Sequence, residues 1–294
     1  MKLTLRNMFL SLSFLLASPA YAESGTSYSG VRLMTLNIAH ARGQGISQIL
    51  QSADHARSNL LGIAEIIIRE QPDIIAFQEI DSNSIWNGRF NHGQFLADKT
   101  QYDNWFLGSH QLSGFLDYGT GLMSKFTLTE SRSISFQKPF ARPKKGFVLS
   151  TVDWPEVENM KVDLVSVHLD FLSHAERRQE MNTLRVALEG RHNLRIIMGD
   201  FNMEYKEKHA LLPNLASVLD LHVWNPLGDE LVTFPKMGTR LDWVLVSREF
   251  RILSHEVLDD PVSDHQPVIV EITVLQENSL VKTRPNITKL VEAD

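Results

Sequence analysis

The chain of 294 residues contains no cysteine, which excludes disulfides and thiolate chemistry. It also lacks a strongly basic run: the densest cluster is Arg142-Pro143-Lys144-Lys145, and the net charge is −6. Without a stripe of Lys and Arg for a long phosphate backbone, tight nucleic-acid binding is less expected. A nuclease is not excluded, because a bound metal ion can supply positive charge. The sequence shows no repeat and no low-complexity block.

Long apolar runs are scarce too, and the one near the start is short. A basic beginning precedes the apolar residues 8–17, and Pro19-Ala20-Tyr21-Ala22 ends in an A-x-A pattern. This order predicts a secretory signal peptide over residues 1–22, cleaved after Ala22. The run is too short to span a bilayer as a stable helix. An uncleaved anchor or a buried N-terminal helix is the alternative.

Export fits the rest of the composition. Loss of residues 1–22 removes two cations and no acid, so the net charge moves from −6 to −8. An exported protein without cysteine suits a bacterial envelope or medium, where stability comes from packing alone. We therefore expect a secreted or periplasmic protein.

One folded domain accounts for most of the chain. The composition, 43% hydrophobic and 22% charged, is ordinary for a globular protein with a sizeable core. We expect a flexible polar leader over residues 23–30, one domain over residues 31–275, and a loosely attached polar tail over residues 276–294.

Helix and strand patterns alternate in places and pair as hairpins in others. Apolar stripes predict helices over residues 54–71 and 174–190, and continuous apolar runs predict buried strands over 32–38 and 194–199. Residues 145–168 form a predicted hairpin around a turn with Pro and Asn. The mixture predicts a mixed sheet, or two sheets, with helices on the outer faces.

Polar side chains stand at the ends of six predicted strands. The most informative is Gly199-Asp200-Phe201-Asn202, which closes an apolar strand with an acid and an amide. The other strand-end groups are Asn37, Glu79, His168, Asp242, Asp264 and His265. Open sheet folds usually build their sites at such ends. Together these groups could hold a divalent cation and a water against a phosphate.

Three of these side chains are hard oxygen donors: Asn37, Glu79 and Asp264. Mg²⁺ prefers few protein oxygens and retains several waters, so a carboxylate pair and an amide suffice. A closed zinc cage is not expected, because cysteine is absent and the histidines are scattered. Each residue alone is more commonly a turn or cap residue, so the metal prediction depends on all three.

The acid and amide of the first motif are two residues apart. In an extended segment, Asp200 and Asn202 project to the same side. Asp200 could then orient or deprotonate a water, and Asn202 could donate to a phosphate oxygen. The alternative is an Asx-turn or helix cap after the strand.

Two histidines are candidates for acid chemistry. His265 can donate a hydrogen bond or a proton to a phosphate oxygen, and Asp242 is the natural carboxylate to orient it. His168 could be a second acid on the leaving-group side, although either histidine could instead be a satisfied strand-end residue. We expect ordinary surface or edge positions for the remaining polar candidates His40, His92, His110, Asp163 and Asp170, and an exposed Trp86.

Assembled in order, these motifs resemble the endonuclease/exonuclease/phosphatase superfamily, the DNase I-like metal-dependent phosphoesterases, over roughly residues 31–275. The matching stretches are Thr35-Leu36-Asn37, Gln78-Glu79, Gly119 to Lys125, Ser166 to Leu169, Gly199 to Asn202, Leu241 to Val244 and Ser263-Asp264-His265. The resemblance implies an α/β fold that is a four-layer α/β/β/α sandwich, with two mixed β-sheets face to face and helices outside.

The resemblance also implies roles for the site residues. Asn37 and Glu79 would bind Mg²⁺, or Mn²⁺ as the alternative, with Asp264 near it. Asp200 would activate water, and Asn202 would contact phosphate. His265 would be the electrophilic histidine, oriented by Asp242. His168 matches the branch with a second histidine, as in DNase I-like nucleases and sphingomyelinases, rather than the apurinic-site endonucleases.

The expected activity is hydrolysis of a phosphodiester by metal-assisted in-line attack of water. One substrate class is a lipid head group or small diester, with peripheral membrane contact through the aromatic loop of residues 85–90. A nonspecific nuclease is the first alternative, with nucleic acid as substrate and basic residues 142–145 along its backbone. A catalytically silent binding protein on the same scaffold is the second. No obligate protein partner is evident.

Overall fold

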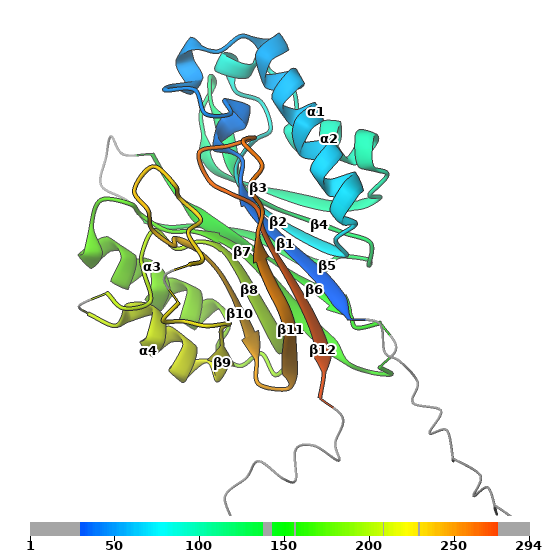
Figure 1. The fold of residues 1–294 in the computed structure, drawn as a ribbon, viewed down its shortest axis with the longest axis vertical. Coiled ribbons are helices and arrows are strands. Elements are labelled where there is room, and N and C mark those ends of the chain that lie inside the picture. The colour runs from blue at the N-terminus through cyan, green and yellow to red at the C-terminus, as the bar shows by residue number, and fades with distance from the viewer. Residues whose placement is uncertain (1–29, 138–142, 156, 208, 229, 276–294) are drawn as a thin grey trace, which may run out of the picture.

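The computed structural model describes residues 30–137, 143–155, 157–207, 209–228 and 230–275. The expected signal peptide, nearly all of the leader and the C-terminal tail lie outside the described residues, so those predictions stay untested. Within the described part, the chain forms two mixed six-stranded sheets with helices on both outer sides (Figure 1). This confirms the predicted four-layer sandwich. No helix in these residues is both long and apolar enough to cross a membrane.

The first sheet has the strand order β11-β12-β1-β2-β4-β3. Its strands are β1 (Val31–Asn37), β2 (Ile74–Asp81), β3 (Asn104–Leu112), β4 (Asp117–Ser124), β11 (Phe250–Val257) and β12 (Val268–Val274). β1 and β2 are parallel, whereas β12 is antiparallel to β1. The end of β1, the end of β2 and the start of β12 therefore share one edge.

The second sheet has the order β5-β6-β7-β8-β10-β9. Its strands are β5 (Thr129–Ser135), β6 (Gly146–Asp153), β7 (Lys161–His168), β8 (Leu194–Asp200), β9 (Leu221–His222) and β10 (Asp242–Ser247). β7 and β8 are parallel, and β10 is antiparallel to β8. The predicted hairpin is confirmed as the antiparallel β6–β7 pair.

Four helices complete the layers. They are α1 (Ala53–Glu70), α2 (His92–Thr100), α3 (His174–Ala187) and α4 (Leu211–Val218), with short 3-10 helices η1 (Ala39–Ala41), η2 (Gln48–Leu50) and η3 (Ile85–Asn87). Figure 1 shows α1 and α2 on one side and α3 and α4 on the other. Ser52 begins α1 by accepting a hydrogen bond from the His55 backbone N–H at 3.1 Å, and Gln71 ends it in a left-handed conformation.

Alternation along the strands supplies three apolar layers. In β1, Leu33 faces the core between the sheets, and its neighbour Met34 faces the core under α1 and α2. Leu245 of β10 packs instead with α3 and α4. Full burial of each such side chain is worth about 1.5–3 kcal/mol. These apolar layers fix the two sheets against each other, so that the polar strand ends of both sheets lie along one side of the sandwich.

The apolar patterns predict a strand over residues 74–77 and a helix over 206–219 interrupted by Pro213, and both sets of bounds were wrong. β2 continues to Asp81, and α4 begins only at Leu211. Pro213 lies in the first turn of α4, where a missing N–H costs nothing. β5 was not predicted, because its sequence TESRSIS is polar and mostly exposed at a sheet edge, and so carries no clear alternation.

Candidate functional site

Strand register places three predicted residues side by side. β8 lies between β7 and β10, and Asp200 pairs in register with His168 on one side and Asp242 on the other. Asp200 and His168 end their strands, whereas Asp242 begins an antiparallel one. The same edge therefore receives all three, and all three are buried.

The first sheet brings its residues to the same place. Asn37 ends β1, and the Asn37 backbone carbonyl accepts a 2.6 Å hydrogen bond from the Ser263 hydroxyl. That bond fixes the segment Ser263-Asp264-His265 against the end of β1. The Asn37 amide reaches across to the second sheet and donates to Asp200 Oδ2 at 3.1 Å. One contact thus joins the two sheets at the site.

Glu79 enters the site through a backbone irregularity. The register of β2 with β4 shifts between Gln78 and Ile80, so Glu79 forms a β-bulge with φ of +51°. Asn202 is also left-handed, with φ of +50°. Such residues cost about 1–3 kcal/mol each and concentrate at functional sites, where a bulge re-aims a side chain.

Asp200 is the centre of the hydrogen-bond network. Its Oδ2 lies 3.2 Å from His168 Nε2 and accepts a 3.2 Å bond from the Asn202 amide. Its Oδ1 accepts from the Asn202 backbone N–H at 2.9 Å. Burial alone would raise the pKa of Asp200, but the charges of His265 and His168 hold it well below its usual range. Asp200 is therefore an ionised acceptor at neutral pH.

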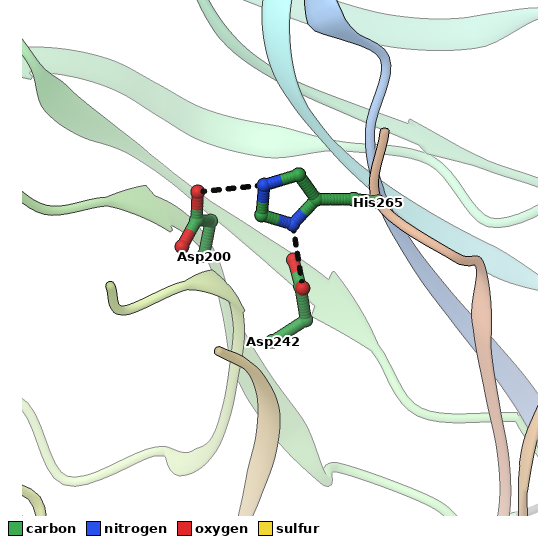
Figure 2. A group of neighbouring side chains, drawn as sticks. All are labelled: Asp200, Asp242 and His265. Atoms are coloured by element: carbon green, nitrogen blue, oxygen red, sulfur yellow. Dashed lines mark hydrogen bonds and ion pairs between the residues drawn. The ribbon is translucent and has the colours of Figure 1, made fainter. Parts of the chain in front are cut away.

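His265 stands between two carboxylates (Figure 2). Its Nδ1 lies 2.8 Å from Asp242 Oδ2, and its Nε2 lies 3.8 Å from Asp200 Oδ2. Burial lowers the pKa of His265, but the two carboxylates outweigh it and raise the pKa to about 10. The backbone N–H of Asp242 donates to Thr233 Oγ1 at 3.1 Å, which fixes the orienting carboxylate. His265 is thus held as an imidazolium that points at the cleft.

Glu79 and Asp264 fit a cation. Arg42 already bridges them: Nη1 lies 3.5 Å from Glu79 Oε2, and Nη2 donates to Asp264 Oδ2. A guanidinium between two carboxylates marks a place where positive charge is stabilised. Hard oxygens are the donors that Mg²⁺ prefers. The Asn37 side-chain oxygen accepts from the Ala39 N–H at 3.0 Å, so Asn37 is the weakest of the three predicted ligands.

Positive neighbours keep Glu79 ionised. Burial would raise the pKa of Glu79, but His40, His168, Lys145 and Arg42 lower it to about 2. His40 Nε2 lies 3.5 Å from Glu79 Oε2, and His40 Nδ1 lies 2.9 Å from Asp81 Oδ1. His40 therefore links Glu79 to a buried second carboxylate behind it.

A cleft of about 550 Å³ exposes these groups to solvent. Its lining includes all the predicted site residues except the buried Asp242, which lies behind His265. The structure therefore brings together the whole predicted set: Asn37, Glu79, His168, Asp200, Asn202, Asp242, Asp264 and His265. Phe171 and Met237, which are largely exposed, form part of the rim.

Two residues of the site were not predicted to belong to it: Arg42, and Lys145, which was expected only as a contact for a nucleic-acid backbone. Lys145 Nζ contacts His168 Nε2, and burial together with Lys145 lowers the pKa of His168. A signal existed for Lys145, because it directly precedes the strand paired with the one that ends in His168. Arg42 had none, since it follows a left-handed turn over Ala39–Ala41 that no sequence pattern announces.

Several expected surface positions were wrong. His40, His92 and His110 are buried, as are Asp163 and Asp170. Trp86 is half-buried, and its Nε1 donates to Asp81 Oδ2 at 2.8 Å. Each of these polar groups has a fixed partner in the fold, and a single sequence cannot show such long-range pairing.

Comparison with known proteins agrees with this geometry. Residues 34–265, more than half of the chain, match the model of the Endonuclease/Exonuclease/phosphatase family. The chain belongs to that family. Its members are hydrolases, both nucleases and phosphatases, and are generally metal-dependent. No curated protein matches the sequence.

Solved structures share the fold at low sequence identity. An endonuclease/exonuclease/phosphatase from Beutenbergia cavernae is 17% identical with a TM-score of 0.68, covering 84% of this chain and 72% of that one. The human Nocturnin catalytic domain with bound sulfate is 20% identical with a TM-score of 0.65, covering 84% and 94%. A mannosyl-6-phosphatase of Bacteroides thetaiotaomicron is 16% identical with a TM-score of 0.59, covering 83% and 99%.

Proposed function

We propose that this protein is a Mg²⁺-dependent phosphoesterase that hydrolyses a phosphodiester by in-line attack of water. The proposal rests mainly on one observation, a single buried carboxylate, Asp200, that two imidazoles and two amides approach from both sheets. Such a group can hold a water and a phosphate in fixed orientation, which is the larger part of phosphoryl-transfer catalysis.

The chain's own residues divide the work. Asp200, held ionised, accepts a hydrogen bond from the attacking water and orients it toward phosphorus. His265, held protonated by Asp242, donates to a phosphate oxygen as charge develops on it. Asn202 supplies a second donor, and His168 faces the leaving group.

Glu79 and Asp264, with Asn37, are the residues that would hold the metal. When bound there, Mg²⁺ supplies neutralisation of phosphate charge. Mn²⁺ has the same preference for oxygen ligands and is the alternative. Arg42 bridges the same two carboxylates and holds them close together.

The substrate class we favour is a lipid head group or small diester. A hydrophobic rim that includes Phe171 and Met237 suits such a substrate and peripheral membrane contact, and the chain carries no long basic stripe. A nuclease and a silent binding protein are the competing outcomes. We also propose that the protein is secreted or periplasmic, which mass spectrometry of the exported product would test by an N-terminus at Glu23.

One assay series tests the proposed activity. The purified protein is incubated with Mg²⁺, Mn²⁺ or EDTA and offered bis-p-nitrophenyl phosphate, sphingomyelin, inositol phosphates, plasmid DNA and RNA. We expect hydrolysis that EDTA abolishes and that Mg²⁺ restores. Nicking of plasmid without head-group release would replace the favoured substrate by nucleic acid. Silence on every substrate with every metal would favour the binding protein.

A further inference from the structure

A second cavity, of about 250 Å³, opens beside the catalytic cleft. The two share the lining residues Arg42, Glu79, Lys145, His168 and Phe171. Because His168 and Glu79 belong to both, a substrate bound at Asp200 can extend directly into the second cavity. The hydrolysis described above makes no use of this space.

The second cavity is positively charged. Its lining carries Arg42, Lys144 and Lys145, and Glu79 is its one carboxylate among the described residues. Arg42 pairs with Glu79, so the lining keeps a net positive charge in a chain whose net charge is −6. A concave surface of one sign concentrates ligands of the opposite sign. Lys144 and Lys145, the two cations of the densest basic cluster that the structure describes, both line this cavity.

The floor of this cavity is built around one buried side chain. His110 is 3% exposed, and its Nε2 lies 2.9 Å from Thr120 Oγ1. Two glycines make room for the ring: a Cβ at Gly119 would lie 2.8 Å from the ring, and a Cβ at Gly146 would lie 2.6 Å from Nδ1. Burial, with the charge of His168, lowers the pKa of His110 to about 3. The floor is therefore polar but uncharged, and the cations stand at the walls.

We propose that the second cavity binds a second phosphate group, carried by the leaving group of the substrate. The proposal rests on the proposed function and narrows it to phosphoesters with an additional phosphate near the bond that is cleaved. The placement follows from His168, which lines both spaces and which the proposed function assigns to the leaving-group side. Water adds to phosphorus, the bond to the leaving oxygen breaks, and that oxygen gains a proton. The second phosphate stays intact.

Competition measures this directly. Hydrolysis of bis-p-nitrophenyl phosphate is inhibited with inositol 1-phosphate or inositol 1,4-bisphosphate, at constant free Mg²⁺. We expect the bisphosphate to bind at least about tenfold tighter than the monophosphate, which is the discrimination of one good charged contact. Lys144→Ala should reduce that ratio severalfold and Lys144→Glu should abolish it. Neither variant should change kcat for bis-p-nitrophenyl phosphate, because its leaving group carries no phosphate.

Lys161→Ala is the matched control. Lys161 begins β7 at the end remote from His168 and pairs with Asp153 at 3.5 Å, so its loss should leave the ratio unchanged. If the wild type binds the bisphosphate and the monophosphate equally, or if the Lys144 variants keep the wild-type affinity ratio, the second phosphate site is overturned even though hydrolysis persists. Complete absence of hydrolysis would instead refute the proposed function. Tighter binding of an uncharged apolar inhibitor than of the bisphosphate would assign the cavity to an apolar leaving group.

Discussion

Both ends of the second sheet hold a buried acid beside a cavity, but among the described residues only the acid at the catalytic end lines its cavity. At the catalytic end, His168 and Asp200 close β7 and β8. At the other end, Asp163 near the start of β7 is fully buried against Arg191. Both ends have an acid with a lowered pKa and a basic partner. Burial and pKa alone therefore do not separate them.

Both oxygens of each acid accept hydrogen bonds from the fold, so the difference lies in what each acid faces. Asp163 accepts from Arg191 Nε at 2.6 Å, and from Asn193 and Thr151 at 2.9 Å, so both its oxygens are held by fixed donors. Asp200 instead faces a cleft beside residues with left-handed backbone, Glu79 and Asn202. Left-handed backbone also occurs beside Asp163, at Glu130, so access of the acid to a cleft is what distinguishes the site from a structural ion pair.

The largest expected effect is loss of catalysis at Asp200. Asp200→Asn keeps the shape of the side chain but removes the charge that orients water. We expect kcat to fall by about 10²–10⁴-fold, the scale of losing a positioned acid or base. The thermal midpoint should stay within a few degrees of wild type. A variant that is as active as wild type under saturating substrate would remove Asp200 from the mechanism.

The residues at the catalytic end could be predicted from the sequence, because the end of a strand has a local sequence signal. The apolar run before Asp200 predicts a strand, and the following acid and amide mark its end. Alternating and paired strands with amphipathic helices predicted a mixed sheet or two sheets with helices outside. The four-layer sandwich and the roles of the cleft residues were implied by the resemblance of the strand-end motifs to the family.

Long-range pairing could not be predicted. Asp163 looked like an edge charge, because its partner Arg191 lies 28 residues away in a loop before β8. Arg42 bridges to Asp264 across 222 residues, and the bulge at Glu79 is a backbone property with no side-chain signature. Such contacts depend on the assembled register, which a periodic pattern does not specify.

The second prediction concerns stability at the opposite end. Asp163→Asn breaks a buried ion pair and leaves Arg191 with only its more exposed partner, Glu130, which should cost about 3 kcal/mol of unfolding free energy. Activity per folded molecule should stay near wild type, the reverse of Asp200→Asn. Asp153→Asn, on the exposed end of the same hairpin, is the control and should shift stability by less than about 0.5 kcal/mol. Urea unfolding measures all three proteins.

The third prediction is the pH dependence of the difference in unfolding free energy between wild type and Asp163→Asn. Burial raises the pKa of Asp163, but hydrogen bonds from Arg191, Asn193 and Thr151 lower it below its ordinary value. A group with a lowered folded-state pKa stabilises above its unfolded pKa, and this stability is lost as pH falls through the folded one. The stability difference between wild type and Asp163→Asn should therefore be full at pH 7 and narrow below about pH 4. A gap that widens in acid would contradict the assignment.

The smallest expected effect is a change in metal affinity at the catalytic end. There, unlike the Arg191–Asp163 pair, the ion pairs of Arg42 with Glu79 and Asp264 must break for a metal to bind. Metal binding to Glu79 and Asp264 must displace Arg42, whose charged hydrogen bonds are worth about 1.5–3 kcal/mol. Arg42→Met removes that competitor and leaves the two carboxylates to repel each other, so the affinity for Mn²⁺ measured by calorimetry should rise about tenfold. Arg248→Met, which removes an exposed pair with Asp220, should leave the affinity unchanged. Weaker Mn²⁺ binding by Arg42→Met would contradict this competition. It would mean that the guanidinium positions Glu79 and Asp264 for the metal, so that Arg42 would have a structural role like that of Arg191 at the other end of the sheet.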